Sequence, residues 1–256
     1  MRTLKLTVEY DGTNYVGWQR QAEGVSIQGL LEDAVAPFSG DAVVVHGAGR
    51  TDAGVHALAQ TASVATSAPH ETGTLQRGLN AVLPADVRVI SVDDAPAGFH
   101  ARFDAISKTY EYRIVNAPFV SAFHHRYVWH VPGALDVEAM RAGAHALLGR
   151  HDFAAFQAAG TEVSSTERTL MAIDVASRPS DAREGLPADC PGVVAIRIEG
   201  DGFLRHMVRA IAGTLVDVGL GRWPASQVDA ILRGRDRGKA GRAAPPGGLF
   251  LIGVRY

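Results

Sequence analysis

Cysteine is almost missing from this chain of 256 residues, which has a single one at position 190. An internal disulfide is therefore impossible, and a zinc site built on several thiolates is excluded. Cys190 stands between Asp189 and Pro191 in a loop-like stretch. We expect it to be a spectator thiol rather than a nucleophile.

Long apolar runs are missing as well. No stretch approaches the roughly 20 apolar residues that span a bilayer. The N-terminal sequence MRTLKLTVEYDG alternates apolar and charged residues where a signal peptide has an apolar core. We therefore expect a cytoplasmic protein with no membrane partner. Hydrophobic residues still make up 46% of the chain, which is enough to bury one large core or two small ones.

A positive net charge, usual in proteins that bind nucleic acid, is the third feature that is lacking. The formal net charge is −2, and lysine is scarce, with 3 residues against 22 arginines. Arginine suits bidentate contacts to phosphate. The basic cluster RGRDRGKAGR at 233–242 fits either a solvated loop or a phosphate-contact surface. Composition leaves both interpretations open.

Several familiar ligand-binding motifs are absent from the sequence. The glycine-rich run 47–52 has Asp52 where a dinucleotide-binding fingerprint has its third glycine, and the run 234–239 is one residue too short for a P-loop. No H-E-x-x-H occurs. The histidines at 124, 125, 145 and 151 are not spaced as metal ligands. The sequence therefore predicts no metal site.

Hydrophobic periodicity predicts a mixed α+β fold. In the first hundred residues the predicted elements run β-α-β-β-α-β, the order of a ferredoxin-like split βαβ unit. Strands are predicted there at 4–10, 42–46, 60–66 and 87–92, and helices at 27–38, with Ser26 as N-cap, and at 74–83. In the second half, strands are predicted at 108–115, 127–131, 170–176, 193–199 and 249–254, and helices after Asp136, at about 203–218 and at 226–232.

Two halves follow from this order of elements. We expect an N-terminal α/β subdomain over 1–104 and a C-terminal α/β subdomain over 105–256, both ferredoxin-like (RRM-like), with mixed, mainly antiparallel sheets. The stretch 177–192 is predicted to be a surface loop.

The segment GAGRTDAGVHA at 47–57 is the first that suggests chemistry. It follows a predicted apolar strand and presents Arg50 and Asp52 between glycines, which let a ligand approach the backbone closely. An aspartate on such a loop beside an arginine can stay ionised and act as a nucleophile or base. The alternative is an Asx-turn in which Asp52 caps its own backbone, and the residues alone favour it.

Two further segments carry candidate site residues. Tyr110, on the strand predicted at 108–115, is either a platform on which a base stacks or a half-buried strand tyrosine. Arg205 and Arg209 are expected one helical turn apart on an apolar helix, where a cation needs an anionic partner. That partner is a carboxylate of an active site or of a structural ion pair, unless the side chain snorkels to water.

Taken together, these segments resemble the tRNA pseudouridine synthase A family. A single G-R-T-D match would mean little, whereas seven segments in the family's order, over both halves, make the resemblance specific. They are YDGTNYVGWQRQ (10–21), SIQGLLEDAV (26–35), GAGRTDAGVHALAQ (47–60), FHARFDAISKTYEYRI (99–114), HDFAAFQ (151–157), GDGFLRHMVRAIAGTLVDVG (200–219) and APPGGLFLIGVRY (244–256).

The resemblance implies two α/β halves around a positively lined central catalytic cleft, and a homodimer whose subunits together hold one tRNA. It implies isomerisation of uridines at tRNA positions 38–40, in the anticodon stem-loop, to pseudouridine, with no metal or organic cofactor. Carried onto this chain, the catalytic aspartate is Asp52, and Arg209 is the arginine that pairs with it. Tyr110 contacts the substrate, Arg50 assists extrusion of the target base, and Leu249 packs under the uracil.

The departures from the family are modest, and two other functions stay open. Tyr10 stands where many members have phenylalanine, and the loop 177–192 has no motif that matches. One alternative is a non-catalytic RNA-binding module that presents aromatic side chains from its sheet. The other is a nucleoside hydrolase, which needs a second acid, and Asp11 or Asp104 is available for that role.

Overall fold

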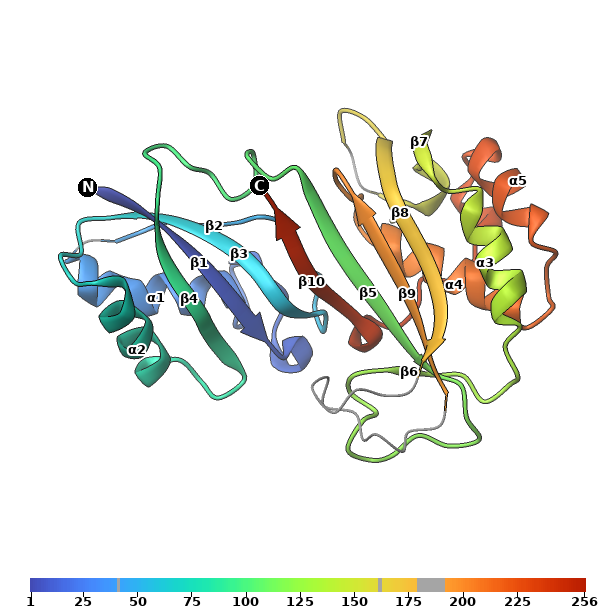
Figure 1. Ribbon diagram of the computed structural model, residues 1–256, viewed down its shortest axis with the longest axis horizontal. Coiled ribbons are helices and arrows are strands. Elements are labelled where there is room, and N and C mark those ends of the chain that lie inside the picture. Colours follow the sequence, from blue (N-terminus) through green and yellow to red (C-terminus); the bar gives the residue numbers. More distant parts are fainter. Residues whose placement is uncertain (41, 161–162, 179–191) are drawn as a thin grey trace. The chain divides into compact units, whose positions relative to one another are not determined.

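The computed structural model describes residues 1–40, 42–160, 163–178 and 192–256. Cys190, with most of the loop predicted at 177–192, lies outside the described residues. The chain divides into two compact units, one of Met1–Ile106 with Phe250–Tyr256 and the other of Ser107–Leu249 (Figure 1). Residues 250–256, which the sequence placed in the C-terminal subdomain, cluster with the N-terminal unit.

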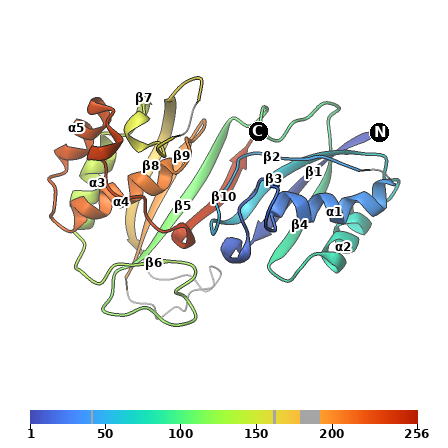
Figure 2. The same cartoon turned by 180° about the vertical axis from the view of Figure 1, so that it is seen from behind.

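The first unit is a mainly antiparallel sheet with two helices on one of its faces (Figures 1 and 2). Its elements are β1 Arg2–Tyr10, α1 Ile27–Ser39, β2 Val45–Gly47, β3 His56–Thr66, α2 Thr72–Val82, β4 Val87–Ala95 and, from Phe250 onward, β10 Leu249–Arg255. β1 lies between β3 and β4 and pairs antiparallel with both. β3 also pairs antiparallel with β2 and parallel with β10.

Local sequence accounts for most of this unit. The alternating apolar residues of β1 are buried, as predicted. Ser26 caps α1, because its hydroxyl oxygen accepts a hydrogen bond from the Gly29 N–H at 3.2 Å. The strand predicted at 42–46 is limited to β2, and β3 begins at His56 rather than at residue 60. Pairing with β10 at His56 extends β3 beyond its own apolar run.

A tight loop joins β2 to β3 and carries Asp52. The N–H of Val55 donates to the carbonyl oxygen of Asp52 at 3.1 Å, which closes the turn. The N–H of Trp18 donates to the carbonyl oxygen of Thr51 at 3.0 Å, which ties the loop to the segment after β1. Main-chain bonds therefore hold the loop on both sides of Asp52.

Gly12, directly after β1, lies against the end of the same loop. A Cβ atom at this position would come within 2.0 Å of the carbonyl oxygen of Val55. The N–H of Gly12 also donates to Nδ1 of His56 at 3.0 Å. Only a residue without a side chain permits this approach.

The second unit also has mainly antiparallel strands. Its elements are β5 Ser107–Val115, β6 Trp129–His130, α3 Val137–His145, β7 Gly149–Asp152, β8 Glu167–Arg178, β9 Val193–Gly200, α4 Met207–Gly219 and α5 Ser226–Gly234. The strand order is β5-β9-β8-β7 with antiparallel neighbours, and β6 pairs parallel with the end of β5, in the region predicted at 127–131. β7 was not predicted, because its sequence GRHD has no apolar alternation.

The helices of this unit gather beside β8 and β9 (Figures 1 and 2). α3 packs against β8 and α4, and α4 packs against β5. Asp136 caps α3 as predicted, because its Oδ1 accepts a hydrogen bond from the Ala139 N–H at 2.9 Å. Within the described ranges, no helix combines the length and the apolar character that a membrane span requires.

β5 is buried on both faces. Tyr110 and Tyr112 lie on one face, and Glu111 and Arg113, each 1% exposed, lie on the other. Nε of Arg113 donates to Oε1 of Glu111 at 2.9 Å, and Arg197 of β9 donates to Oε2 at 2.8 Å. Both carboxylate oxygens of the buried Glu111 therefore accept from a guanidinium group, as a buried charge requires.

α4 begins at Met207, so the predicted start near residue 203 is wrong. His206 has a left-handed backbone with φ of 62°, and the carbonyl oxygen of Arg205 accepts from the Ala158 N–H at 2.9 Å. These contacts interrupt the helix, so Arg205 is an exposed residue that precedes it. The prediction that Arg205 and Arg209 lie one helical turn apart is therefore also wrong.

The backbone of α4 touches the segment 241–248, which leads into β10. A Cβ atom at Gly213 would lie 1.8 Å from the carbonyl oxygen of Arg242. The N–H of Gly241 donates to Oγ1 of Thr214 at 3.0 Å. The helix and this segment consequently behave as one packed element.

We expect Gly12→Ala to destabilise the protein by at least about 1–3 kcal/mol, because the new methyl group meets a main-chain carbonyl that cannot rotate away. The free energy of unfolding in urea measures this loss. Gly73→Ala in α2 is the matched control, since a Cβ atom there meets only the end of the Arg77 side chain at 3.5 Å and alanine favours a helix. Equal stabilities of the two variants would contradict the close contact.

We expect Glu111→Gln to lower the free energy of unfolding by about 3–5 kcal/mol, because the Arg113 cation stays buried without its carboxylate. The same change at Glu138, which is 81% exposed and pairs with Arg141, should cost less than about 1 kcal/mol. Urea denaturation of both variants gives the comparison. A loss at Glu111 as small as that at Glu138 would show that the pair contributes little.

Candidate active site

Asp52 is half-buried in the loop between β2 and β3, and Arg50 is exposed. The residue between them points into the unit: Oγ1 of the buried Thr51 lies 2.9 Å from the hydroxyl oxygen of Tyr10. This hydrogen bond anchors the loop to β1 at the residue next to Asp52.

Tyr10 is the anchor on β1. Burial raises the pKa of its phenol to about 12, although the hydrogen bonds with Thr51 and Gln60 act to lower it. The hydroxyl group is therefore neutral at physiological pH and can donate as well as accept. Gln60 also donates through Nε2 to the carbonyl oxygen of Gly49 at 2.8 Å, which holds the loop near its start.

His56 closes the loop at the start of β3 and is 1% exposed. Its ring stacks on Phe250 with 4.7 Å between centroids and 22° between planes. Nδ1 lies 3.0 Å from the amide nitrogen of Gly12 and 3.1 Å from Oδ1 of Asp11. Because the Gly12 N–H can only donate, Nδ1 is the acceptor in the contact with Gly12.

Tyr110 lies on β5 of the second unit and is 6% exposed. Its ring meets Phe203 edge-on, with 5.1 Å between centroids and 81° between planes. Such a T-shaped contact is a favoured aromatic geometry. Packing against Phe203 therefore fixes the orientation of the Tyr110 ring.

Arg209 lies in the first turn of α4 and is half-buried. Its Nε donates to the carbonyl oxygen of Ala244 at 2.8 Å, and its own carbonyl oxygen accepts from the Ala244 N–H at 2.9 Å. This reciprocal pair of bonds fixes the guanidinium group through both its side chain and its backbone.

Tyr112 also contacts the segment that holds Arg209. Its hydroxyl donates to the carbonyl oxygen of Pro245 at 2.7 Å. Burial raises the pKa of its phenol, and the positive charges of Arg209 and Arg242 act to lower it. Two guanidinium groups thus lie near one neutral phenol, which makes this corner of the second unit locally cationic.

Leu249 is the first residue of β10 and is 5% exposed. It follows the 3₁₀ turn Pro246–Gly248. A Cβ atom at Gly248 would lie 2.9 Å from the carbonyl oxygen of Arg113. Leu249 is therefore positioned by a turn that packs on β5.

The predicted site residues fall into two sets. Arg50 and Asp52 share one loop of the first unit, whereas Tyr110, Arg209 and Leu249 belong to the second unit. Main-chain bonds hold the loop of the first set, and contacts with Phe203 and Ala244 orient Tyr110 and Arg209 in the second set. The predicted pairing of Asp52 with Arg209 joins the two sets and stays a prediction.

The sequence did not indicate the residues that support these side chains. Thr51 and His56 stand inside the segment that carries Asp52, but nothing in their spacing shows which of them points inward. Tyr112 stands two residues after Tyr110 on the strand predicted at 108–115 and therefore on the same face, but the sequence does not indicate its bond to Pro245. The only usable signal was the run of chemically distinctive residues around Asp52.

The basic cluster at 233–242 is engaged mainly in local contacts. Arg233 pairs with Asp229 at 3.0 Å, and Arg235 pairs with Asp152 at 3.2 Å. Arg237 donates to the carbonyl oxygen of Gly241 at 3.0 Å. Among the described side chains, no group of three or more His, Cys, Asp or Glu residues is arranged to hold a metal ion.

Comparison with known proteins places these features in one family. Residues 6–104 and 144–256 match the family model described as tRNA pseudouridine synthase. The proteins named tRNA pseudouridine synthase A from Pelobacter propionicus and Geotalea uraniireducens are each 43% identical over 256 residues, covering 100% of both chains. The one from Thermoanaerobacter sp. is 41% identical with the same coverage. The chain therefore belongs to the tRNA pseudouridine synthase family.

Proposed function

We propose that this protein isomerises uridines at positions 38–40 of the tRNA anticodon stem-loop to pseudouridine, with Asp52 as the catalytic carboxylate. Its family makes the chain an isomerase that converts uridine to pseudouridine. The observation that carries the role of Asp52 is its half-buried place on a loop that main-chain bonds hold on both sides. A carboxylate held in this way is preorganised to react.

The reaction breaks the bond between N1 of uracil and C1′ of ribose, turns the base, and joins C5 to C1′. The proton on C5 leaves and N1 gains one, so the product has the same composition as the substrate. No oxidant, reductant or energy source is consumed, and we propose that neither a metal nor an organic cofactor takes part. Asp52 can act by adding to the uracil ring or by acting at the ribose, and both routes use one ionised carboxylate.

We propose that residues of the second unit act on the same nucleotide. A flipped base costs a few kcal/mol of lost stacking, which Tyr110 offsets by contact with the substrate and Leu249 by packing under the uracil. Arg50 assists extrusion of the base. Arg209 pairs with Asp52 as its counter-charge, and its fixed guanidinium group supports that role.

The finer architecture is also part of this proposal. We infer that both units are ferredoxin-like and flank a catalytic cleft, which the β-α-β-β-α-β order of the first unit supports. The second unit departs from that order, because β7, β8 and β9 follow one another between α3 and α4. We further propose that the protein acts in the cytoplasm as a homodimer that holds tRNA with both subunits.

A nucleoside hydrolase would need a second available acid, and the two candidates have other contacts. Oδ1 of Asp11 accepts from the N–H and the hydroxyl of Thr13, at 3.0 and 2.5 Å. Oδ2 of Asp104 accepts from the His100 N–H at 2.8 Å. Both carboxylates therefore cap local backbone, which disfavours this alternative.

We expect Asp52→Asn to abolish turnover while it preserves folding and tRNA binding, because the amide has the shape of the carboxylate without its charge. Tritium release from tRNA labelled at uridine C5 measures turnover, and filter binding measures affinity. Asp104→Asn is the matched control and should keep near wild-type release. Release by Asp52→Asn at the wild-type rate would remove it from the chemistry, and free uracil among the products would favour the hydrolase.

We expect Tyr110→Phe to lower kcat by about tenfold, the effect of roughly one lost hydrogen bond to the substrate, with little change in the Kd for tRNA. The ring and its contact with Phe203 are retained, so only the hydroxyl is removed. Single-turnover kinetics at saturating enzyme separates the two effects. Unchanged kcat would show that the hydroxyl has no part in the reaction.

A further inference from the structure

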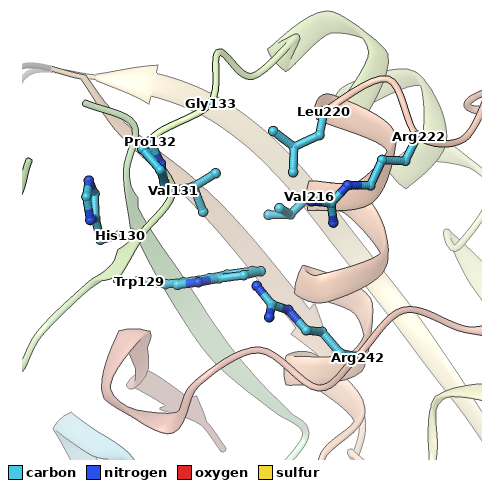
Figure 3. A pocket seen from close by; sticks show the side chains of 9 residues that line it. All are labelled: Trp129, His130, Val131, Pro132, Gly133, Val216, Leu220, Arg222 and Arg242. Atoms are coloured by element: carbon cyan, nitrogen blue, oxygen red, sulfur yellow. The ribbon is translucent and has the colours of Figure 1, made fainter. Parts of the chain in front are cut away.

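A small pocket lies within the second unit, lined entirely by residues that the proposed chemistry does not use (Figure 3). It encloses about 210 Å³. Its wall comes from the stretch that includes β6, from the end of α4 with the residues that directly follow it, and from the segment before β10. The lining residues are Trp129, His130, Val131, Pro132, Gly133, Val216, Leu220, Arg222 and Arg242.

Arg242 and Trp129 form one side of this pocket. The Cζ atom of Arg242 lies over the indole ring, 5.2 Å from its centroid, within the range of a cation–π contact. Trp129 is 8% exposed, so the ring is a fixed support. The Arg242 backbone is fixed as well, because its carbonyl oxygen lies against Gly213 of α4.

Arg222 supplies a second guanidinium group. It is held by Asp217, whose Oδ1 lies 2.6 Å from Nη1 of Arg222. Figure 3 shows both guanidinium groups directed into the same hollow, with Val216 and Leu220 forming apolar walls beside them. Among the described residues, Asp217 is the only carboxylate paired with either cation, so the part of the pocket that the structure describes carries a net positive charge.

Arg242, the last residue of the basic cluster at 233–242, differs from two other arginines of that cluster. Arg233 and Arg235 each have a carboxylate partner, whereas no carboxylate among the described residues lies within ion-pair distance of Arg242. A preorganised guanidinium group over an aromatic ring is well suited to bind phosphate with two parallel N–H donors.

We propose that this pocket binds a phosphate group of the RNA backbone, with Arg242 as the main contact and Arg222 as the second. The proposal rests on the proposed function only in that the ligand is RNA. The volume favours a part of a larger ligand, because pockets that enclose a whole small molecule measure about 300–1,000 Å³. The apolar walls accommodate the adjoining ribose.

The test compares binding of tRNA to the full-length protein and its variants over a range of salt concentrations. Arg242→Gln should weaken binding about tenfold or more at low salt. It should also reduce the slope of log affinity against log salt by about 0.7–0.9, the effect of one lost phosphate contact. Arg242→Lys keeps the charge and should restore the slope but not the full affinity.

Arg233→Gln is the matched control, since it removes the same charge from the same region outside the pocket. It should leave the slope nearly unchanged. An unaltered slope in Arg242→Gln would overturn the proposal, and so would an equal reduction in both variants, which would mean a general charge effect. Binding is the readout, so loss of pseudouridine formation in any variant does not decide the result.

A second arm distinguishes the RNA backbone from a free nucleotide. If UMP or inorganic phosphate bound in the pocket, tryptophan emission would change and Trp129→Phe would abolish that change, since Trp129 lies under Arg242. We expect no such change at millimolar UMP, because a single phosphate lacks the rest of the RNA. Arg242-dependent binding of UMP together with an unaltered tRNA slope would assign the pocket to a free nucleotide and overturn the RNA source.

Discussion

A main-chain contact is the constraint on which the first half of the site depends. Gly12 lies so close to the carbonyl oxygen of Val55 that no side chain fits between them. From the same segment, Trp18 holds the carbonyl oxygen of Thr51. These backbone contacts and the buried Tyr10–Thr51 hydrogen bond set the geometry of the loop that carries Asp52.

In the second unit, too, a glycine allows close contact with a main-chain carbonyl group. Gly213 lets α4 approach the carbonyl oxygen of Arg242, and the reciprocal bonds between Arg209 and Ala244 lock the two segments together. One short segment, 241–248, thereby orients Arg209, receives the hydroxyl of Tyr112 and carries Arg242. Positive charge is concentrated here by packing, in a chain whose formal net charge is −2.

Short-range features of the fold were predictable from the sequence. Alternation predicted β1, and the N-cap residues Ser26 and Asp136 predicted the starts of α1 and α3. The start of α4 was not predictable. The apolar run includes Phe203 and Leu204. A left-handed residue at His206 and a main-chain bond from Ala158 to Arg205 nevertheless prevent the helix from starting before Met207. A local pattern carries no information about a contact with residue 158.

The sequence by itself determined the family and singled out the residues proposed to do its chemistry, because the segment around Asp52 and the six others are local strings of distinctive side chains. Only the tertiary structure decided that residues 250–256 cluster with the first unit, that Glu111 and Arg113 are buried together, and that Arg242 lies over Trp129. Each of these depends on burial or on which distant segments meet. That outcome is governed by packing of the whole chain and not by the order of neighbouring residues.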